Sequence, residues 1–313
     1  MTNCHNLSPT FWPTEKEFSD AKEKFGYIPG NLHFAVVGGT CVGKSTLVNS
    51  FRGLTANSDN AAPTGYNRIT IEAGRYSHPD KKSLLSRIVW YDMPGSGTRT
   101  TPGGYFNAQG LFIFDFIIVV LGARFMTDDI DVLARCKAYN IPYFVVRSMA
   151  DCRIWNTQSD INCSYDEAYK IYIDGSRSAF KKFLKEASEN VCLDCDKEIF
   201  LVSKNPLREL IKSLMDGKAP ESTEGLIDEQ SLVTNILLVA QKGCCPSEYG
   251  VGWALMEPPN PVYRSLYRFA GEFEHRTQNT KRKWASPPQP TKDNMKRHRY
   301  HNATTPFTNQ IWR

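Results

Sequence analysis

Long hydrophobic runs are missing from this chain of 313 residues. The longest apolar stretch covers residues 111–123, and Asp115 interrupts it. A membrane-spanning helix needs about 20 apolar residues, so this stretch is too short and is better interpreted as a central strand with its lead-in. The first 13 residues also lack the basic and apolar regions of a secretory signal. We therefore expect a cytoplasmic protein.

Paired cysteines are scarce. The chain has nine cysteines, an odd number, and only two close pairs. Cys192 and Cys195 have C-x-x-C spacing, but Cys244 and Cys245 are adjacent, which fits a zinc site poorly. We expect free thiols, as in a reducing cytosol.

Basic charge is concentrated at one end of the chain. The whole chain has a formal net charge of +5. Residues 276–313 alone have a net charge of about +8, from nine Lys or Arg and one Asp, so the rest of the chain is net negative. No nucleic-acid-binding motif accompanies this charge, and we expect no nucleic-acid partner. The tail has little apolar patterning, which predicts disorder. It is either a solvated extension or a peripheral contact for an anionic intracellular membrane.

The strongest motif present is G-x-x-x-x-G-K-S at residues 38–45, the pattern of a phosphate-binding P-loop. An apolar segment, 32–37, precedes it as a buried strand, and residues 46–51 can continue as a helix. Glycines let backbone N–H groups close on phosphate oxygens, and the helix N-terminus adds its positive dipole end. The candidate phosphate-binding residues are Gly38, Gly39, Thr40, Cys41, Val42, Gly43, Lys44, Ser45 and Thr46.

Two later segments fit the same chemistry. The turn-rich stretch 54–68 contains Ala-Ala-Pro-Thr-Gly, and Thr64 is the candidate for sensing the γ-phosphate. A strand over 87–91 ends in Asp92-Met93-Pro94-Gly95, where the aspartate would hold Mg²⁺ and Gly95 would present its backbone N–H to the γ-phosphate. The candidate magnesium ligands are Ser45, Thr64 and Asp92. The candidate catalytic groups are Lys44, Thr64 and Gly95.

Strand and helix patterns alternate along the chain, which predicts an α/β fold with a mostly parallel sheet and helices on both faces. The predicted strands are 32–37, 69–73, 87–91, 116–121, 142–146 and 198–202. The predicted helices are 14–25, 46–51, 128–139, 165–186, 207–215, 226–241 and 262–273. The stretch 96–110 is glycine-rich and is interpreted as a second switch loop. The predicted organisation is an N-terminal arm and helix (1–29), a nucleotide-binding domain (30–217), a short helical region (218–275) and a disordered basic tail (276–313).

Four stretches, GGTCVGKST, AAPTG, DMPG and VRSMAD, together resemble the immunity-related, interferon-inducible GTPase family. The resemblance covers about residues 30–215. It implies a Ras-like P-loop NTPase domain, Mg²⁺-dependent binding and hydrolysis of GTP, self-association through the G domain and, often, work at intracellular membranes. It assigns guanine recognition to Ser148 and Asp151, with Ser203 and Lys204 as a further base-contacting loop.

Two positions differ from the residues that the resembled family or Ras-like enzymes have there. Met149 stands where the family has a lysine whose stem packs on the base, a role that a flexible methionine can also fill. Ser96 stands where Ras-like enzymes have a glutamine that orients water. Two functions follow: a GTPase that hydrolyses slowly and couples this to self-association, or a nucleotide-binding switch or scaffold with little or no hydrolysis. An ATPase is less favoured, because adenine lacks the N–H pair that Asp151 would accept.

Overall fold

The computed structural model describes residues 13–65, 70–81, 84–96, 104–189, 191, 193–217 and 225–242. The helix predicted over 262–273 and the basic tail over 276–313 lie outside the described residues.

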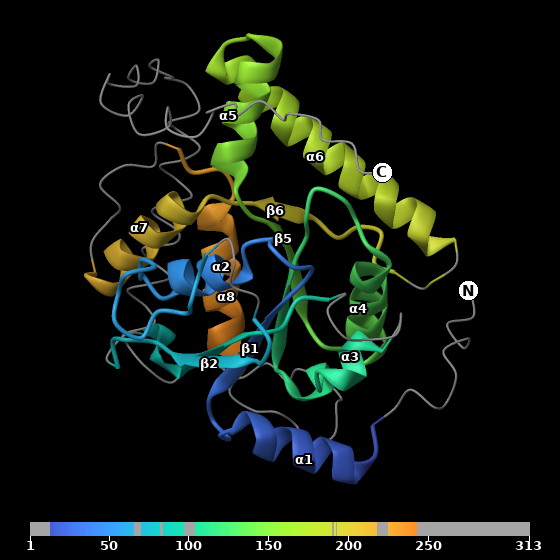
Figure 1. Ribbon diagram of the computed structural model, residues 1–313. Helices are drawn as coiled ribbons and strands as arrows, with labels where there is room; N and C mark the ends of the chain where they lie inside the picture. Colours follow the sequence, from blue (N-terminus) through green and yellow to red (C-terminus); the bar gives the residue numbers. More distant parts are fainter. Residues whose placement is uncertain are drawn as a thin grey trace, which may run out of the picture. The chain divides into compact units, whose positions relative to one another are not determined.

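Within the described residues, six strands form one sheet in the order β2-β3-β1-β4-β5-β6 (Figure 1). Neighbouring strands are parallel except β2, which runs antiparallel to β3. This is the predicted α/β architecture with a mostly parallel sheet. The strands are β1 (Leu32–Val37), β2 (Gly74–Ser77), β3 (Ile88–Asp92), β4 (Phe116–Val120), β5 (Tyr143–Arg147) and β6 (Ile199–Leu201).

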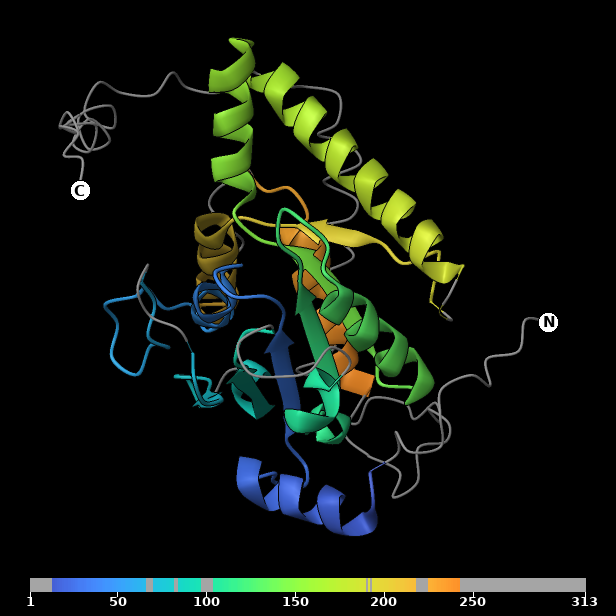
Figure 2. The ribbon, with the colours of Figure 1, turned by 45° about the vertical axis from the view of Figure 1, so that its right-hand side comes forward.

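Helices cover both faces of the sheet, as Figures 1 and 2 show. Successive strand residues point to opposite faces, and both faces are apolar, as expected for buried parallel strands. Ala35 and Tyr91 belong to the core under α3 (Tyr105–Ala108), α4 (Thr127–Ala138) and α6 (Tyr165–Ser188). Phe34 and Trp90 belong to the core under α2 (Lys44–Phe51), α7 (Lys204–Met215) and α8 (Glu229–Lys242).

The register of the central strands determines where the motifs meet. Val36 of β1 lies opposite Asp92 of β3, and Val37 lies opposite Val119 of β4. The three strands therefore end at nearly the same level. The loop after β1 and the aspartate that ends β3 emerge side by side at the carboxyl edge of the sheet, where ligands bind in folds of this kind.

Helix α1 (Glu15–Phe25) lies at the opposite, amino-terminal edge of the sheet (Figure 1). A capping box between Thr14 and Glu17 starts the helix, and Gly26, in the left-handed region, ends it. The Tyr91 hydroxyl donates to the Phe25 carbonyl at 2.9 Å, which anchors the end of α1 to β3. The helix predicted over 14–25 is confirmed.

The strand predicted over 69–73 is wrong in its described part. Residues 70–73 are not in a strand, and β2 begins at Gly74. Pairing with β3 places Tyr76 opposite Trp90, and the Arg52 guanidinium lies 5.1 Å from the Tyr76 ring centroid. Alternation of apolar residues alone does not select a strand when the cross-strand partners lie elsewhere.

Four other elements were not predicted. Helix α5 (Ala150–Ile161) follows β5 after two residues and forms a helical hairpin with α6, whose tip projects beyond the carboxyl edge of the sheet (Figure 2). Its buried residues are only Ala150 and Ile154, so it has almost no apolar stripe to detect. In the predicted switch loop over 96–110, residues 105–108 form α3, and the short 3₁₀ helix η3 (Leu111–Ile113) follows the loop. A second 3₁₀ helix, η2 (Leu84–Arg87), precedes β3.

Candidate nucleotide-binding site

The loop between β1 and α2 follows the backbone path that its glycines permit. Gly38 has a φ of +137°, and a Cβ at this position would lie 2.1 Å from the Val120 carbonyl oxygen of β4. Gly43 has a φ of +93°, and a Cβ there would lie 2.7 Å from the Ser148 hydroxyl. Only glycine fits both the positive φ and the close approach. The loop is thus packed between β4 and the segment after β5.

Lys44 places its ammonium inside this loop. Its side chain is 6% exposed, and Nζ donates to the carbonyl oxygens of Gly38 at 3.1 Å and Gly39 at 2.7 Å. Burial lowers the pKa of Lys44, whereas the negative charge of Asp92 acts to raise it. The loop therefore holds a buried cation at the start of α2, where the helix dipole also favours an anion.

Ser45 and Asp92 form the part of the site that fits Mg²⁺. The Ser45 hydroxyl donates to Asp92 Oδ2 at 2.6 Å. Asp92 is 2% exposed, and its other oxygen, Oδ1, has no hydrogen-bond partner among the described residues. Burial raises the pKa of this carboxyl. A buried carboxylate oxygen without a partner, next to a hydroxyl, is a donor set that suits a hard cation with oxygen ligands.

The threonine that contacts Asp92 is not the one that the sequence singled out. Thr70 Oγ1 donates to Asp92 Oδ2 at 3.3 Å. Thr64 is half-buried in the loop after α2 and has no hydrogen bond to Ser45 or Asp92 within the described residues. Thr70 lies in a stretch predicted to be a strand, so its sequence context carried no signal of a site.

The Asp92–Gly95 segment lies directly on the P-loop. The Ser96 N–H donates to the Gly38 carbonyl at 3.1 Å, and Gly39 and Ser96 form an isolated parallel bridge. A Cβ on Gly95 would lie 2.9 Å from the Thr40 nitrogen. The buried Tyr105 hydroxyl of α3 donates to the Pro94 carbonyl at 2.6 Å and holds the segment from the other side. Sequence reasoning did not identify Tyr105.

The predicted base-binding residues come together from two distant segments. The Ser148 hydroxyl donates to the P-loop carbonyl of Val42 at 2.5 Å. Met149 has a φ of +62° and is 37% exposed. The Asp151 N–H donates to the hydroxyl of the buried Ser203 at 3.0 Å, and Lys204 is exposed at the start of α7. Ser148 therefore connects the base motif to the P-loop, and Ser203 connects it to the loop after β6.

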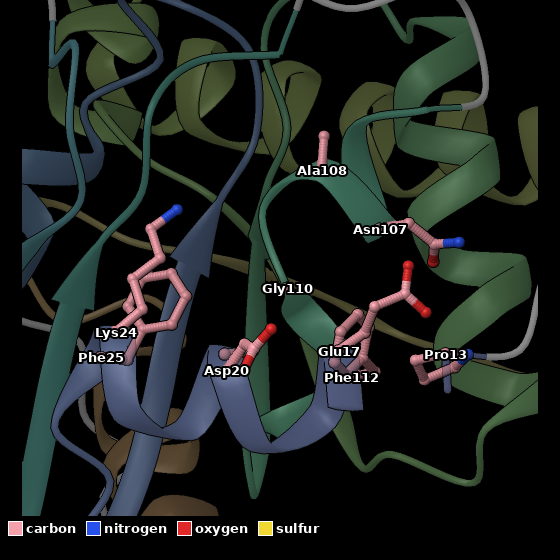
Figure 3. A pocket seen from close by; sticks show the side chains of 10 residues that line it. Pro13, Glu17, Asp20, Lys24, Phe25, Asn107, Ala108, Gly110 and Phe112 are labelled. Atoms are coloured by element: carbon pink, nitrogen blue, oxygen red, sulfur yellow. The ribbon is translucent and has the colours of Figure 1, made fainter. Parts of the chain in front are cut away.

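Two cavities differ in their suitability for a polyphosphate. One, of about 320 Å³, lies beside the P-loop and is lined by Thr40, Cys41 and Met149 among others. The other, of about 270 Å³, lies between α1 and α3 (Figure 3). Around this second cavity, the carboxylates of Glu17 and Asp20 outnumber the ammonium of Lys24, so the lining is net negative and would repel phosphate. Around the first cavity, three arginines outnumber Asp128 and Asp129, so the lining is net positive. The cavity beside the P-loop is therefore the one suited to a nucleotide.

Neither a metal cluster nor a membrane span occurs in the part of the chain that the structure describes. No three His, Cys, Asp or Glu side chains gather there in a way that would hold a metal ion. None of the described helices is both long and apolar enough to cross a bilayer. Cys41, Cys136, Cys152, Cys163 and Cys195 are free thiols.

Comparison with known proteins agrees with the motifs. Mouse interferon-inducible GTPase 1 is 32% identical over 126 residues, which are 40% of this chain and 30% of that protein. Mouse T-cell-specific guanine nucleotide triphosphate-binding protein 2 is 30% identical over 173 residues, which are 55% of this chain and 39% of that protein. The chain thus spans about a third of the length of these curated relatives.

The chain is less similar to proteins of known structure. Toc33 from Arabidopsis thaliana, in complex with Mg²⁺ and GMPPNP, matches 75% of this chain and 95% of its own, with a TM-score of 0.41 and 15% identity. A match at this level is too weak to transfer a function.

The family comparison covers the whole site. The family model described as Interferon-inducible GTPase (IIGP) matches residues 26–208. This range is more than half of the chain and contains all four motifs that the resemblance rests on. The chain belongs to the interferon-inducible GTPase family.

Proposed function

We propose that this protein binds GTP with Mg²⁺ at the P-loop and hydrolyses it slowly. The observation that carries the proposal is the arrangement of Lys44, Ser45 and Asp92: a buried ammonium within the loop, next to a hydroxyl–carboxylate pair with one unpartnered oxygen. Such an arrangement binds phosphate and a divalent cation together. The named relatives are GTPases or guanine nucleotide triphosphate-binding proteins, which agrees with this proposal.

The predicted catalytic, magnesium-binding and base-binding residues each have a role in this proposal. Lys44 would neutralise charge on the β- and γ-phosphates, and Gly95 would donate its backbone N–H to the γ-phosphate. Ser45 and Asp92 would hold Mg²⁺, which supplies positive charge to the phosphates. Thr64 would join them by movement of its loop. Asp151 would accept the guanine N–H pair, with Ser148, Ser203 and Lys204 supporting the base.

Slow hydrolysis follows from the residue after Gly95. Ser96 has no carboxamide to orient water, and its N–H donates to Gly38. Groups from a second G domain would then raise the rate, which connects hydrolysis to self-association. The second candidate function, a nucleotide-binding switch or scaffold with little hydrolysis, is favoured by the same Ser96 and by Met149.

A single-turnover assay separates these functions. We expect GTP hydrolysis whose rate constant rises with protein concentration. Lys44→Ala should abolish tight nucleotide binding, because Lys44 is the cation placed for the phosphates, whereas Lys182→Ala, at a position 77% exposed on α6, should bind like the parent protein. Binding without hydrolysis at any concentration would favour the switch or scaffold. Equal GTP binding by Lys44→Ala and the parent would contradict the site.

The proposal also covers the cellular location of the protein and the role of its basic tail. We propose that the protein is cytoplasmic and that residues 276–313 contact anionic intracellular membranes through their excess of Lys and Arg.

A further inference from the structure

The segment after the nucleotide-binding domain sends one carboxylate into the loop that follows β6. Glu229, the first residue of α8, is 0% exposed. Its Oε1 accepts the Ser203 N–H at 2.6 Å, and its Oε2 accepts the Ile227 N–H. A fully buried carboxylate is unfavourable unless its oxygens are used, and both oxygens of Glu229 are used by backbone N–H groups.

Ser203 relays this contact to Asp151. The Ser203 N–H donates to Glu229, while the Ser203 hydroxyl accepts the Asp151 N–H at 3.0 Å. A neighbouring backbone hydrogen bond joins the same two segments: the Ala150 N–H donates to the Val202 carbonyl at 3.1 Å. Ser203 is therefore held on one side by α8 and on the other by the first turn of α5. Asp151 itself is exposed, so its position depends on such backbone contacts.

The neighbouring residue, Asp228, has a different set of contacts. Its carboxylate accepts the Leu201 N–H at 2.8 Å and the Arg177 guanidinium at 2.8 Å. These contacts attach the start of α8 to β6 and α6 without touching Ser203 or Asp151. Attachment of the helix and contact with the base loop are thus carried by two adjacent side chains.

We propose that Glu229 is a positioning residue for guanine recognition, which orders the Ser203 loop and, through Ser203, the backbone that presents Asp151. The inference rests on the proposed guanine-nucleotide-binding function. It means that the chain after the G domain contributes to base selectivity, although no side chain of α8 is assigned a contact with the base.

The test is the preference for GDP over ADP in the full-length protein, measured as the dissociation constant for ADP divided by the dissociation constant for GDP. In Glu229→Gln, the amide nitrogen cannot accept an N–H, so Ser203 or Ile227 loses its acceptor. We expect weaker GDP binding and unchanged ADP binding, because adenine offers no N–H pair to Asp151. The ratio should fall about fivefold, the effect of weakening one hydrogen bond.

Matched variants separate positioning from general stability. Ser203→Ala should lower the ratio in the same way, and the double variant should show less than the sum of the two effects, as expected for residues in one path. Asp228→Asn weakens the attachment of α8 and should leave the ratio unchanged. If Glu229→Gln does not fold by circular dichroism, Glu229→Asp, which withdraws the carboxylate from Ser203, replaces it.

Each outcome bears on one proposal. A guanine-selective parent with an unchanged ratio in the Glu229 variant would overturn the inference. An equal fall in Asp228→Asn would also overturn it, because helix attachment would then explain the effect. A parent that binds GDP and ADP equally would instead contradict guanine recognition by Asp151, and with it the proposed function.

Discussion

Glu229 should make the folded protein less stable as the pH rises. Burial raises the pKa of this carboxyl from 4.5 to about 7, and the nearby Asp228 charge acts in the same direction, whereas the N–H groups of Ile227 and Ser203 oppose it. A carboxyl with a raised pKa binds its proton more tightly in the folded than in the unfolded chain. Its contribution to stability is therefore fully present below about pH 4.5 and is lost as the pH rises through about 7.

The size of this effect follows from the same values. The difference between 4.5 and about 7 corresponds to roughly 3 kcal/mol of unfolding free energy, since each pKa unit is worth about 1.4 kcal/mol. Glu229→Gln removes the titration and leaves the shape almost unchanged. The free energy of unfolding of the variant should therefore improve relative to the parent protein by up to about 3 kcal/mol between pH 4.5 and 8.

Urea unfolding of both proteins at several pH values measures this difference. Other buried groups, such as Asp129, whose pKa burial raises to about 6, titrate in both proteins and cancel in the comparison. Glu186→Gln, at a position 65% exposed on α6, is the control for the loss of a carboxylate that is not buried. A Glu229→Gln difference that is constant from pH 4.5 to 8 would refute the reasoning.

Two further predictions concern the base and the tail. Met149→Lys should tighten GTP binding severalfold, because a lysine stem packs on the base and its ammonium lies near phosphate charge; an unchanged dissociation constant for GTP would show that Met149 already fills this role. Truncation after His275 should abolish pelleting with anionic vesicles at low salt, which high salt should also reverse, and should leave GTP binding unchanged; equal pelleting with and without residues 276–313 would leave the tail a solvated extension.

Local patterns were sufficient for most of the sheet and for the P-loop. The strands β1, β3, β4, β5 and β6 lie within one or two residues of their predicted positions, because a buried parallel strand is a short apolar run between turns, visible without knowledge of its partners. The P-loop at residues 38–45 was equally clear, since its glycines and Lys44 lie within eight consecutive residues. Alternation of strand and helix was enough to predict a mostly parallel sheet with helices on both faces.

Tertiary structure decided the features that depend on contacts between distant residues. The position of β2 follows from pairing with β3, and the threonine beside Asp92 is Thr70, across 22 positions of sequence. The contact between Glu229 and Ser203 spans 26 positions, and nothing in the order of residues near either one indicates it. A motif records which groups can bind a nucleotide, whereas the buried hydrogen bonds that orient those groups form only when the sheet brings distant segments together.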